Sequence, residues 1–188
     1  MLKASDFEVP QNRHRVIIIG IRDDVKGDFV FPAPIISPDL TVSTVINNSI
    51  LDDEKFEVWP LSPQAQLLSS YIPAGGSWKN IPDDVLPERL KRIRKEIKRY
   101  RSPNFYRKFN LDEIMGTITA AATPENSGIL HPLENRRYSV REIARFQSFP
   151  DEFKFIGDSI PSKYKMIGNA VPPKLAYHIA KSVLEQVF

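Results

Sequence analysis

Two arginines near the start of the chain, Arg13 and Arg15, have the chemistry to stabilise negative charge on an oxygen atom. A guanidinium group stays ionised and presents its donors in a fixed plane. A run of β-branched residues follows at 16–21, and it predicts a strand buried on both faces of a mostly parallel sheet. One strand cannot make a sheet, so it pairs with strands further along or with another polypeptide. The alternative is two ordinary surface arginines before a strand.

The chain contains no cysteine among its 188 residues. Disulfides, thiolate metal sites and thiol nucleophiles are therefore excluded, and we expect no metal site. A hydrophobic content of 41% can support one domain, or a small domain joined to part of a larger one. The sequence shows no signal peptide and no apolar stretch long enough to span a bilayer, so we expect a cytoplasmic protein without membrane contact.

Positive charge is concentrated between Leu86 and Lys108. This segment has ten basic and two acidic residues, whereas the formal charge of the whole chain is only +3. Such a cluster attracts a phosphate backbone, and Arg94, Lys95 and Lys98 are our candidates for DNA contact. A solvated helix face is the alternative. Pro87 suits a first helical position, and the apolar residues that follow have helical spacing.

Helix signals dominate the last third of the chain. Ser139 and Glu142 have the spacing of a capping box, which predicts a helix that ends before Pro150. Gly168-Asn169 predicts a tight turn, and a second helix should begin at Pro172-Pro173. One face of that helix should be buried as far as the C-terminus; its apolar residues are Leu175, Ala176, Ile179, Ala180, Val183, Leu184 and Val187.

Three segments resemble, in order, the last three motifs of the cytosine-5 DNA methyltransferases. They are 8–15 (EVPQNRHR), 139–151 (SVREIARFQSFPD) and 167–173 (IGNAVPP). In the first, Glu8 replaces the family's usual glycine. The resemblance implies that Arg15 donates to O2 of a flipped cytosine, that Arg13 organises the pocket, and that Gln11 lies at the DNA.

The resemblance also implies roles for residues closer to the C-terminus. Thr117 of a Thr-Ile-Thr segment would contact a phosphate beside the target base, and Arg141 with Glu142 would support the recognition domain. The cofactor would be S-adenosylmethionine, near Asn169, Ala170 and Val171. Residues 71–82 resemble the Pro-x-Gly-Gly-x-Trp segment of many target-recognition domains, in which Trp78 would anchor the loop in the core.

The family's chemistry begins with a cysteine thiolate, and this chain also lacks the Glu-Asn-Val segment and the glycine-rich cofactor loop. We therefore interpret the chain as the C-terminal portion of such an enzyme, either the small subunit of a naturally split bacterial or phage enzyme or an excised piece. Its partners would be double-stranded DNA and an N-terminal catalytic polypeptide that binds most of the cofactor. A stand-alone basic DNA-binding module and an inactive remnant are the alternatives.

The expected fold class is α+β, with a loop-rich recognition domain containing short strands. One strand and the closing helices of a Rossmann-like methyltransferase domain would flank it. Residues 1–24 would complete the catalytic domain, residues 25–156 would form the recognition domain, and residues 157–188 would return to the catalytic side.

Overall fold

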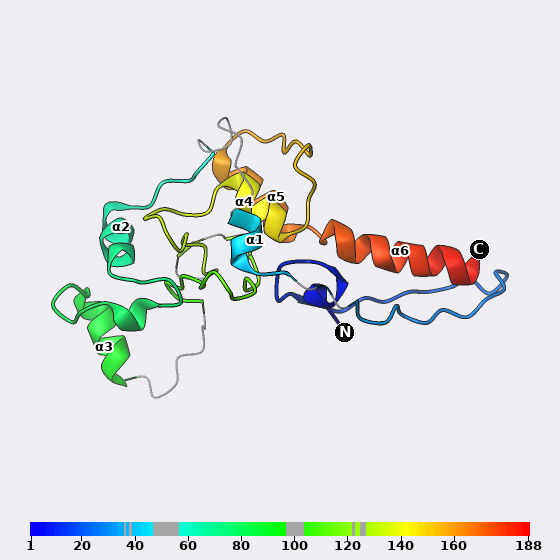
Figure 1. Cartoon of the computed structure of the whole chain (residues 1–188), viewed down its shortest axis with the longest axis horizontal. Helices are drawn as coiled ribbons and strands as arrows, with labels where there is room; N and C mark the ends of the chain where they lie inside the picture. The colour runs from blue at the N-terminus through cyan, green and yellow to red at the C-terminus, as the bar shows by residue number, and fades with distance from the viewer. Residues whose placement is uncertain (36, 38, 47–56, 97–103, 122, 125–126) are drawn as a thin grey trace.

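The structure is a computed structural model, and it describes residues 1–35, 37, 39–46, 57–96, 104–121, 123–124 and 127–188. Six α-helices are assigned in this part of the chain (Figure 1): α1 (Val42–Ile46), α2 (Pro63–Ser70), α3 (Glu88–Glu96), α4 (Val140–Phe146), α5 (Ile160–Asn169) and α6 (Pro173–Val187). Helices α2 and α3 lie at one end of an elongated molecule, and α6 projects from the other end.

The assigned sheet is much smaller than the sequence suggests. Strands β1 (Leu2–Lys3) and β2 (His14–Arg15) pair antiparallel around the 3₁₀-helix η1 (Ala4–Phe7). None of the residues 16–21 belongs to an assigned strand, so this segment pairs with no strand of the described chain. Pairing with the sheet of another polypeptide stays a prediction. Val16 is 71% exposed and Ile18 is 90% exposed. Ile17, Ile19 and Ile21 are half-buried. The described part of the chain supplies no further strands to cover the exposed side of this segment.

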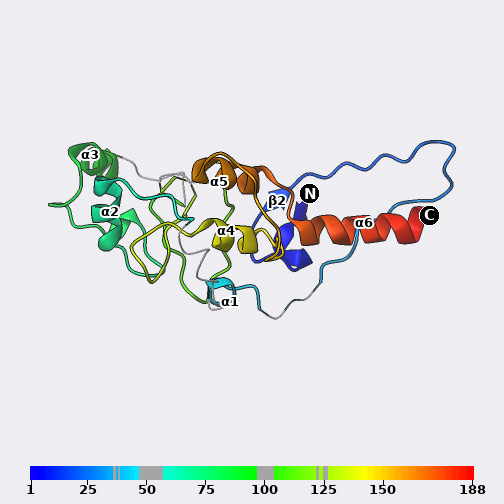
Figure 2. The same ribbon diagram turned by 90° about the horizontal axis from the view of Figure 1, so that it is seen from above.

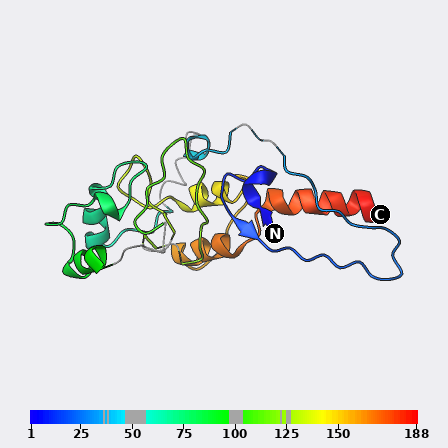
Figure 3. The ribbon, with the colours of Figure 1, turned by 90° about the horizontal axis from the view of Figure 1, so that it is seen from below.

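Residues 16–35 leave β2, run along α6 to its C-terminal end and return, as the three views show (Figures 2 and 3). The contact at the far end involves Gln186, whose side-chain amide exchanges two hydrogen bonds with the backbone of Val30, at 2.8 and 3.0 Å. This excursion therefore rests on α6 through few specific contacts.

Two larger clusters and one small cluster of buried side chains hold the described residues together. The first surrounds α4 and α5 and includes Ile143, Phe146 and Ile167. The second lies beneath α2 and α3 and includes Trp78, as the sequence predicts for this side chain. The third joins Phe7 of η1 to Leu175 of α6 and is the smallest. The molecule thus has separate cores at its centre, at the α2 and α3 end, and at the base of α6.

Helix α4 begins as the sequence predicts. The hydroxyl of Ser139 accepts a hydrogen bond from the backbone of Glu142 at 3.1 Å, and the Glu142 carboxylate accepts one from the backbone of Ser139 at 2.5 Å. The helix ends at Phe146, before Pro150. This capping box satisfies backbone donors that the first turn of a helix leaves unpaired.

The prediction of a tight turn at Gly168-Asn169 is wrong, because both residues belong to the last turn of α5. Glycine is required there for a different reason. A Cβ atom on Gly168 would lie 2.6 Å from the backbone of Thr119 and Ala120. The missing side chain lets α5 approach the 117–120 segment, and the chain changes direction only at Ala170.

Helix α6 begins at Pro173 as predicted, but its apolar face is not buried to the C-terminus. Leu175 is fully buried, whereas Ala176, Ala180 and Leu184 are exposed. The first two turns pack against η1, and beyond them only the irregular excursion lies alongside. The helical periodicity is confirmed, but the excursion covers the far half only in part: Ser182 is buried and Val183 and Val187 are half-buried, while Leu184 stays exposed.

Helix α3 begins one residue after Pro87, in agreement with the predicted start. Of the predicted apolar positions, Leu86 is buried and Leu90 and Ile93 are half-buried, while position 97 lies outside the described residues. No described helix is long and apolar enough to cross a membrane. Among the described residues, no group of histidine and carboxylate side chains is arranged to hold a metal ion.

Candidate functional site

The side chain of Arg13 joins three segments that are distant in sequence. Its guanidinium donates to the carbonyl of Ile118 at 2.8 Å and to the carbonyls of Gly168 and Ala170 at 2.8 and 3.2 Å. The side chain is almost completely buried, and burial, with a smaller effect of nearby Arg15, lowers the pKa of Arg13 to about 10. It remains charged at neutral pH. Arg13 therefore links the backbone of the first motif to that of the 118 and 168–170 segments.

Gln11 reinforces the same junction. Its amide nitrogen donates to the carbonyl of Phe146 and to the side chain of Gln147, both at 3.2 Å. Its amide oxygen accepts from the backbone of Ile118 at 3.1 Å. The resemblance places Gln11 at the DNA, but the side chain is fully buried. In this structure it therefore has no surface available for DNA, and it braces the backbone instead.

Arg15 has surroundings unlike those of Arg13. It is half-buried and its guanidinium donates to the carbonyl of the preceding residue, His14, at 2.7 Å. That bond lies at the surface. Arg15 therefore stands on β2, next to the Arg13 junction, with its charged group accessible.

Thr117 and the residues of the predicted cofactor turn lie around the same junction. The hydroxyl of Thr117 donates to the carbonyl of Asn12 at 2.8 Å, which ties the Thr-Ile-Thr segment to the first motif. Asn169 and Val171 are exposed and Ala170 is half-buried. The described chain thus brings all three motifs together within one junction.

The basic candidates on α3 have different surroundings. Arg94 donates to the carbonyl of Trp78 and, at 2.9 Å, to that of Ile81, and it stacks over the Trp78 ring. Lys95 is exposed, and Lys98 lies outside the described residues. Arg94 therefore anchors α3 to the Trp78 loop, a role that charge alone does not reveal, and Lys95 remains a candidate for phosphate contact.

Arg141 and Arg145 are one helical turn apart and would repel each other without outside partners. Arg145 pairs with Asp151 at 2.7 Å, and Arg141 donates to the carbonyls of Pro150 and Phe153 at 3.2 and 2.9 Å. Both side chains fasten the segment after α4. The wider role implied for Arg141, support of a recognition domain, stays a prediction.

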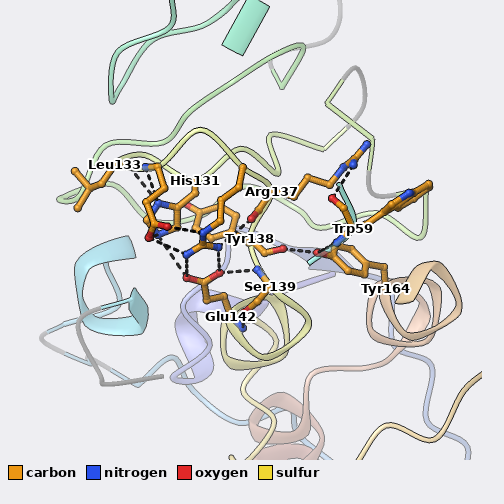
Figure 4. Close-up of polar contacts among 10 residues, drawn as sticks. Trp59, His131, Leu133, Arg137, Tyr138, Ser139, Glu142 and Tyr164 are labelled. Atoms are coloured by element: carbon orange, nitrogen blue, oxygen red, sulfur yellow. Dashed lines mark hydrogen bonds and ion pairs between the residues drawn. The ribbon is translucent and has the colours of Figure 1, made fainter. Parts of the chain in front are cut away.

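A buried polar network on the other side of α4 escapes sequence reasoning (Figure 4). The Glu142 carboxylate, fully buried, receives both guanidinium nitrogens of Arg136 at 2.7 and 3.0 Å. His131 Nδ1 accepts backbone hydrogen bonds from residues 133 and 134, and its Nε2 lies 3.4 Å from the Glu142 carboxylate. Only the capping-box spacing of Glu142 is visible in the sequence, because contacts between a helix and an irregular loop leave no periodic signal.

The surroundings of Glu142 shift its acidity strongly. Desolvation raises the pKa of this carboxyl, but hydrogen bonds from His131 and Arg136 and the charge of Arg136 oppose it and lower the pKa to about 2. The hydroxyl of Tyr164 donates to the carbonyl of Tyr138 in the same region. The network therefore ties the loop before α4 to both α4 and α5.

Comparisons with known proteins identify the family of this chain. The C-5 cytosine-specific DNA methylase family matches residues 1–185. The chain is 34% identical to type II methyltransferase M.NgoFVII of Neisseria gonorrhoeae, over 96% of this chain and 47% of the relative. It is 32% identical to M.Sau96I of Staphylococcus aureus, over 98% and 42%.

A shorter match extends to plants. DNA (cytosine-5)-methyltransferase CMT3 of Arabidopsis thaliana is 50% identical over 46 residues, which are 24% of this chain and 6% of the relative. The chain spans less than half the length of the two bacterial relatives. Since the family matches nearly every residue and the bacterial alignments cover almost the whole chain, this protein belongs to the C-5 cytosine-specific DNA methylase family.

Proposed function

We propose that this chain is the C-terminal, target-recognising portion of a DNA (cytosine-5-)-methyltransferase. With an N-terminal catalytic polypeptide it would transfer a methyl group from S-adenosylmethionine to C5 of a flipped cytosine in duplex DNA. Residues 1–24 and 157–188 would complete the catalytic domain, and residues 25–156 would recognise the target. S-adenosylmethionine supplies the methyl group, and Asn169, Ala170 and Val171 would contact it at one edge.

One observation carries this proposal. Arg13 connects the first motif to the Thr-Ile-Thr segment and to the residues that precede α6, so segments far apart in the sequence form one junction. Arg15 stands beside it with an accessible guanidinium. Removing water around such a donor strengthens its attraction for the charge that develops on the cytosine O2.

The requirement for a second polypeptide has two supports. The chain has no cysteine and therefore cannot supply the family's nucleophile. It also exposes apolar side chains on the 16–21 segment and on α6, including Ile18, Leu184 and Phe188. A groove of about 360 Å³ between residues 19–25 and the end of α6 is lined mainly by apolar side chains. These surfaces suit burial against the sheet of a complementary catalytic domain.

Reconstitution tests the proposal directly. The chain is mixed with an N-terminal polypeptide that contains the catalytic cysteine and the cofactor loop, and incorporation of labelled methyl groups into duplex DNA is measured. Activity is expected only in the mixture, and replacing the cysteine of the N-terminal polypeptide by serine should abolish it. Methyl incorporation by the single chain, or a stable complex that lacks activity, would overturn the proposal.

A further inference from the structure

Glu8 has an unusual backbone conformation for a residue with a side chain. It follows η1 with φ 60° and ψ 22°, in the left-handed region. That region favours glycine, because a Cβ atom there crowds the backbone. Glu8 therefore has a strained backbone conformation in this chain. Strained residues persist only where surrounding contacts hold them in place.

The contacts that hold Glu8 come from the first turns of α6. Its carboxylate lies 2.8 Å from Nε2 of His178 and 3.6 Å from Nζ of Lys174. These two residues are one helical turn apart and share one face of the helix. The hydrogen bond from His178 lowers the pKa of Glu8, with desolvation opposing it and Lys174 adding to the effect. Glu8 is therefore ionised at neutral pH and paired with α6.

The same two elements meet through apolar contacts. Phe7 and Val9, on either side of Glu8, are buried with Leu175 of α6. The rings of Phe7 and His178 have centroids 6.1 Å apart. Glu8 thus adds a directional charged contact to a small apolar interface, and a charged contact fixes orientation more closely than apolar packing does.

The position of this interface connects it to the proposed chemistry. Three residues after Glu8 the chain enters the segment that carries Arg13 and Arg15, and α6 begins two residues after Val171. We propose that Glu8 is a positioning residue, which through His178 and Lys174 fixes the arginine-bearing segment relative to the start of α6. This inference rests on the proposed function and assigns Glu8 no contact with substrate or cofactor.

Replacing Glu8 by glycine separates positioning from simple stabilisation. Glu8→Gly relieves the left-handed strain and removes the carboxylate, so thermal stability should remain near wild type. Turnover of the reconstituted enzyme per folded molecule should fall about three- to tenfold, because small misplacements of catalytic groups are costly. Parallel changes in stability and turnover, or unchanged turnover, would overturn the inference.

A double-mutant cycle tests whether Glu8 and His178 act as a pair. Glu8→Gln and His178→Gln should each lower turnover, and the double variant should be no worse than the more damaging single one. Glu185→Gln, which alters a pair with Lys181 at 3.8 Å on the same helix, is the matched control and should leave turnover unchanged. Additive losses would show that Glu8 and His178 act separately and would contradict the proposal.

The cycle also distinguishes failure of this inference from failure of the proposed function. If the wild-type mixture does not methylate DNA, the function is overturned, and the same cycle is then measured on the unfolding free energy of the chain. Coupling between Glu8 and His178 supports the contact, and its absence overturns it. If wild type is active while Glu8→Gly is equally active, only the positioning role fails.

Discussion

Arg13 and Arg15 are close neighbours in the sequence, but they differ in burial and in the groups that they bind. Arg13 is buried and donates to backbone carbonyls from two distant segments, whereas the described hydrogen bond of Arg15 goes to the carbonyl of the adjacent His14. A buried guanidinium whose two terminal nitrogens donate to backbone carbonyls supports the fold, whereas the guanidinium of Arg15 makes its described hydrogen bond at the surface.

Replacement of Arg15 by alanine should reduce methyl transfer by the reconstituted enzyme about a hundredfold or more, as expected when one preorganised transition-state donor is removed. The melting temperature of the chain should change little, because the side chain supports no distant segment through its described hydrogen bond. Single-turnover methyl transfer, normalised to folded protein, measures the effect. A lower melting temperature with wild-type turnover would make Arg15 a structural residue.

Arg13→Ala is the contrasting variant for this prediction. It leaves the carbonyls of Ile118 and Gly168 without their charged donor and opens a cavity, so the free energy of unfolding should fall by about 3 kcal/mol. Urea denaturation of the two variants side by side gives the comparison. Equal stability of the two would contradict the division of roles.

Helix α4 is the element whose structure is most predictable from the sequence. A capping box depends only on residues three positions apart, so it can be predicted without knowing any tertiary contact. The partners of Glu142 are not predictable, because His131 and Arg136 reach it from a loop. The 16–21 segment is unpredictable for a related reason. A β-branched run indicates burial in a sheet but not which chain supplies that sheet, and the described chain supplies none.

The depressed pKa of Glu142 has a defined consequence for stability. Its folded value is about 2 and its ordinary value is 4.5, so its contribution is complete above pH 4.5 and is lost as the pH falls toward 2. Glu142→Gln should flatten the acid limb of the unfolding free energy in this window. Glu8, Glu134 and Asp151 also have lowered pKa values and should leave a residual slope. If the unfolding free energies of wild type and variant fall identically below pH 4.5, Glu142 does not make this contribution to stability.

The exposed basic residues of helix α3 should contribute to DNA affinity. Arg89, Arg92 and Lys95 are exposed and recur every three residues, so they share one face, whereas Arg94 points to the Trp78 loop. Changing the three exposed residues to glutamine should reduce the salt dependence of DNA binding, by a slope of about 0.9 for each phosphate that is no longer neutralised. Filter binding between low and high salt measures this. An unchanged slope would mean that this face lies away from DNA.

At the scale of the whole molecule, two apolar surfaces of the described chain remain uncovered. The motifs, their order and the absence of a cysteine can all be read from the sequence. The exposure of 16–21 and of the far half of α6 cannot be predicted from it, because periodicity indicates which residues prefer burial and not whether a covering surface exists. Uncovered apolar surface of this kind marks an interaction site.

Assembly with the proposed catalytic polypeptide should depend on the 16–21 segment. Ile18 is 90% exposed, so Ile18→Asp should leave the melting temperature of the isolated chain unchanged. Buried in the sheet of the catalytic polypeptide, an unpaired carboxylate is strongly unfavourable, and the dissociation constant of the complex should rise at least about a hundredfold. Leu67→Asp is the matched control, because Leu67 is 52% exposed on α2, at the opposite end of the molecule from α6. Sedimentation of the labelled chain with the catalytic polypeptide measures both affinities. If the two variants assemble equally well, the 16–21 segment is not the surface through which this chain joins a catalytic domain.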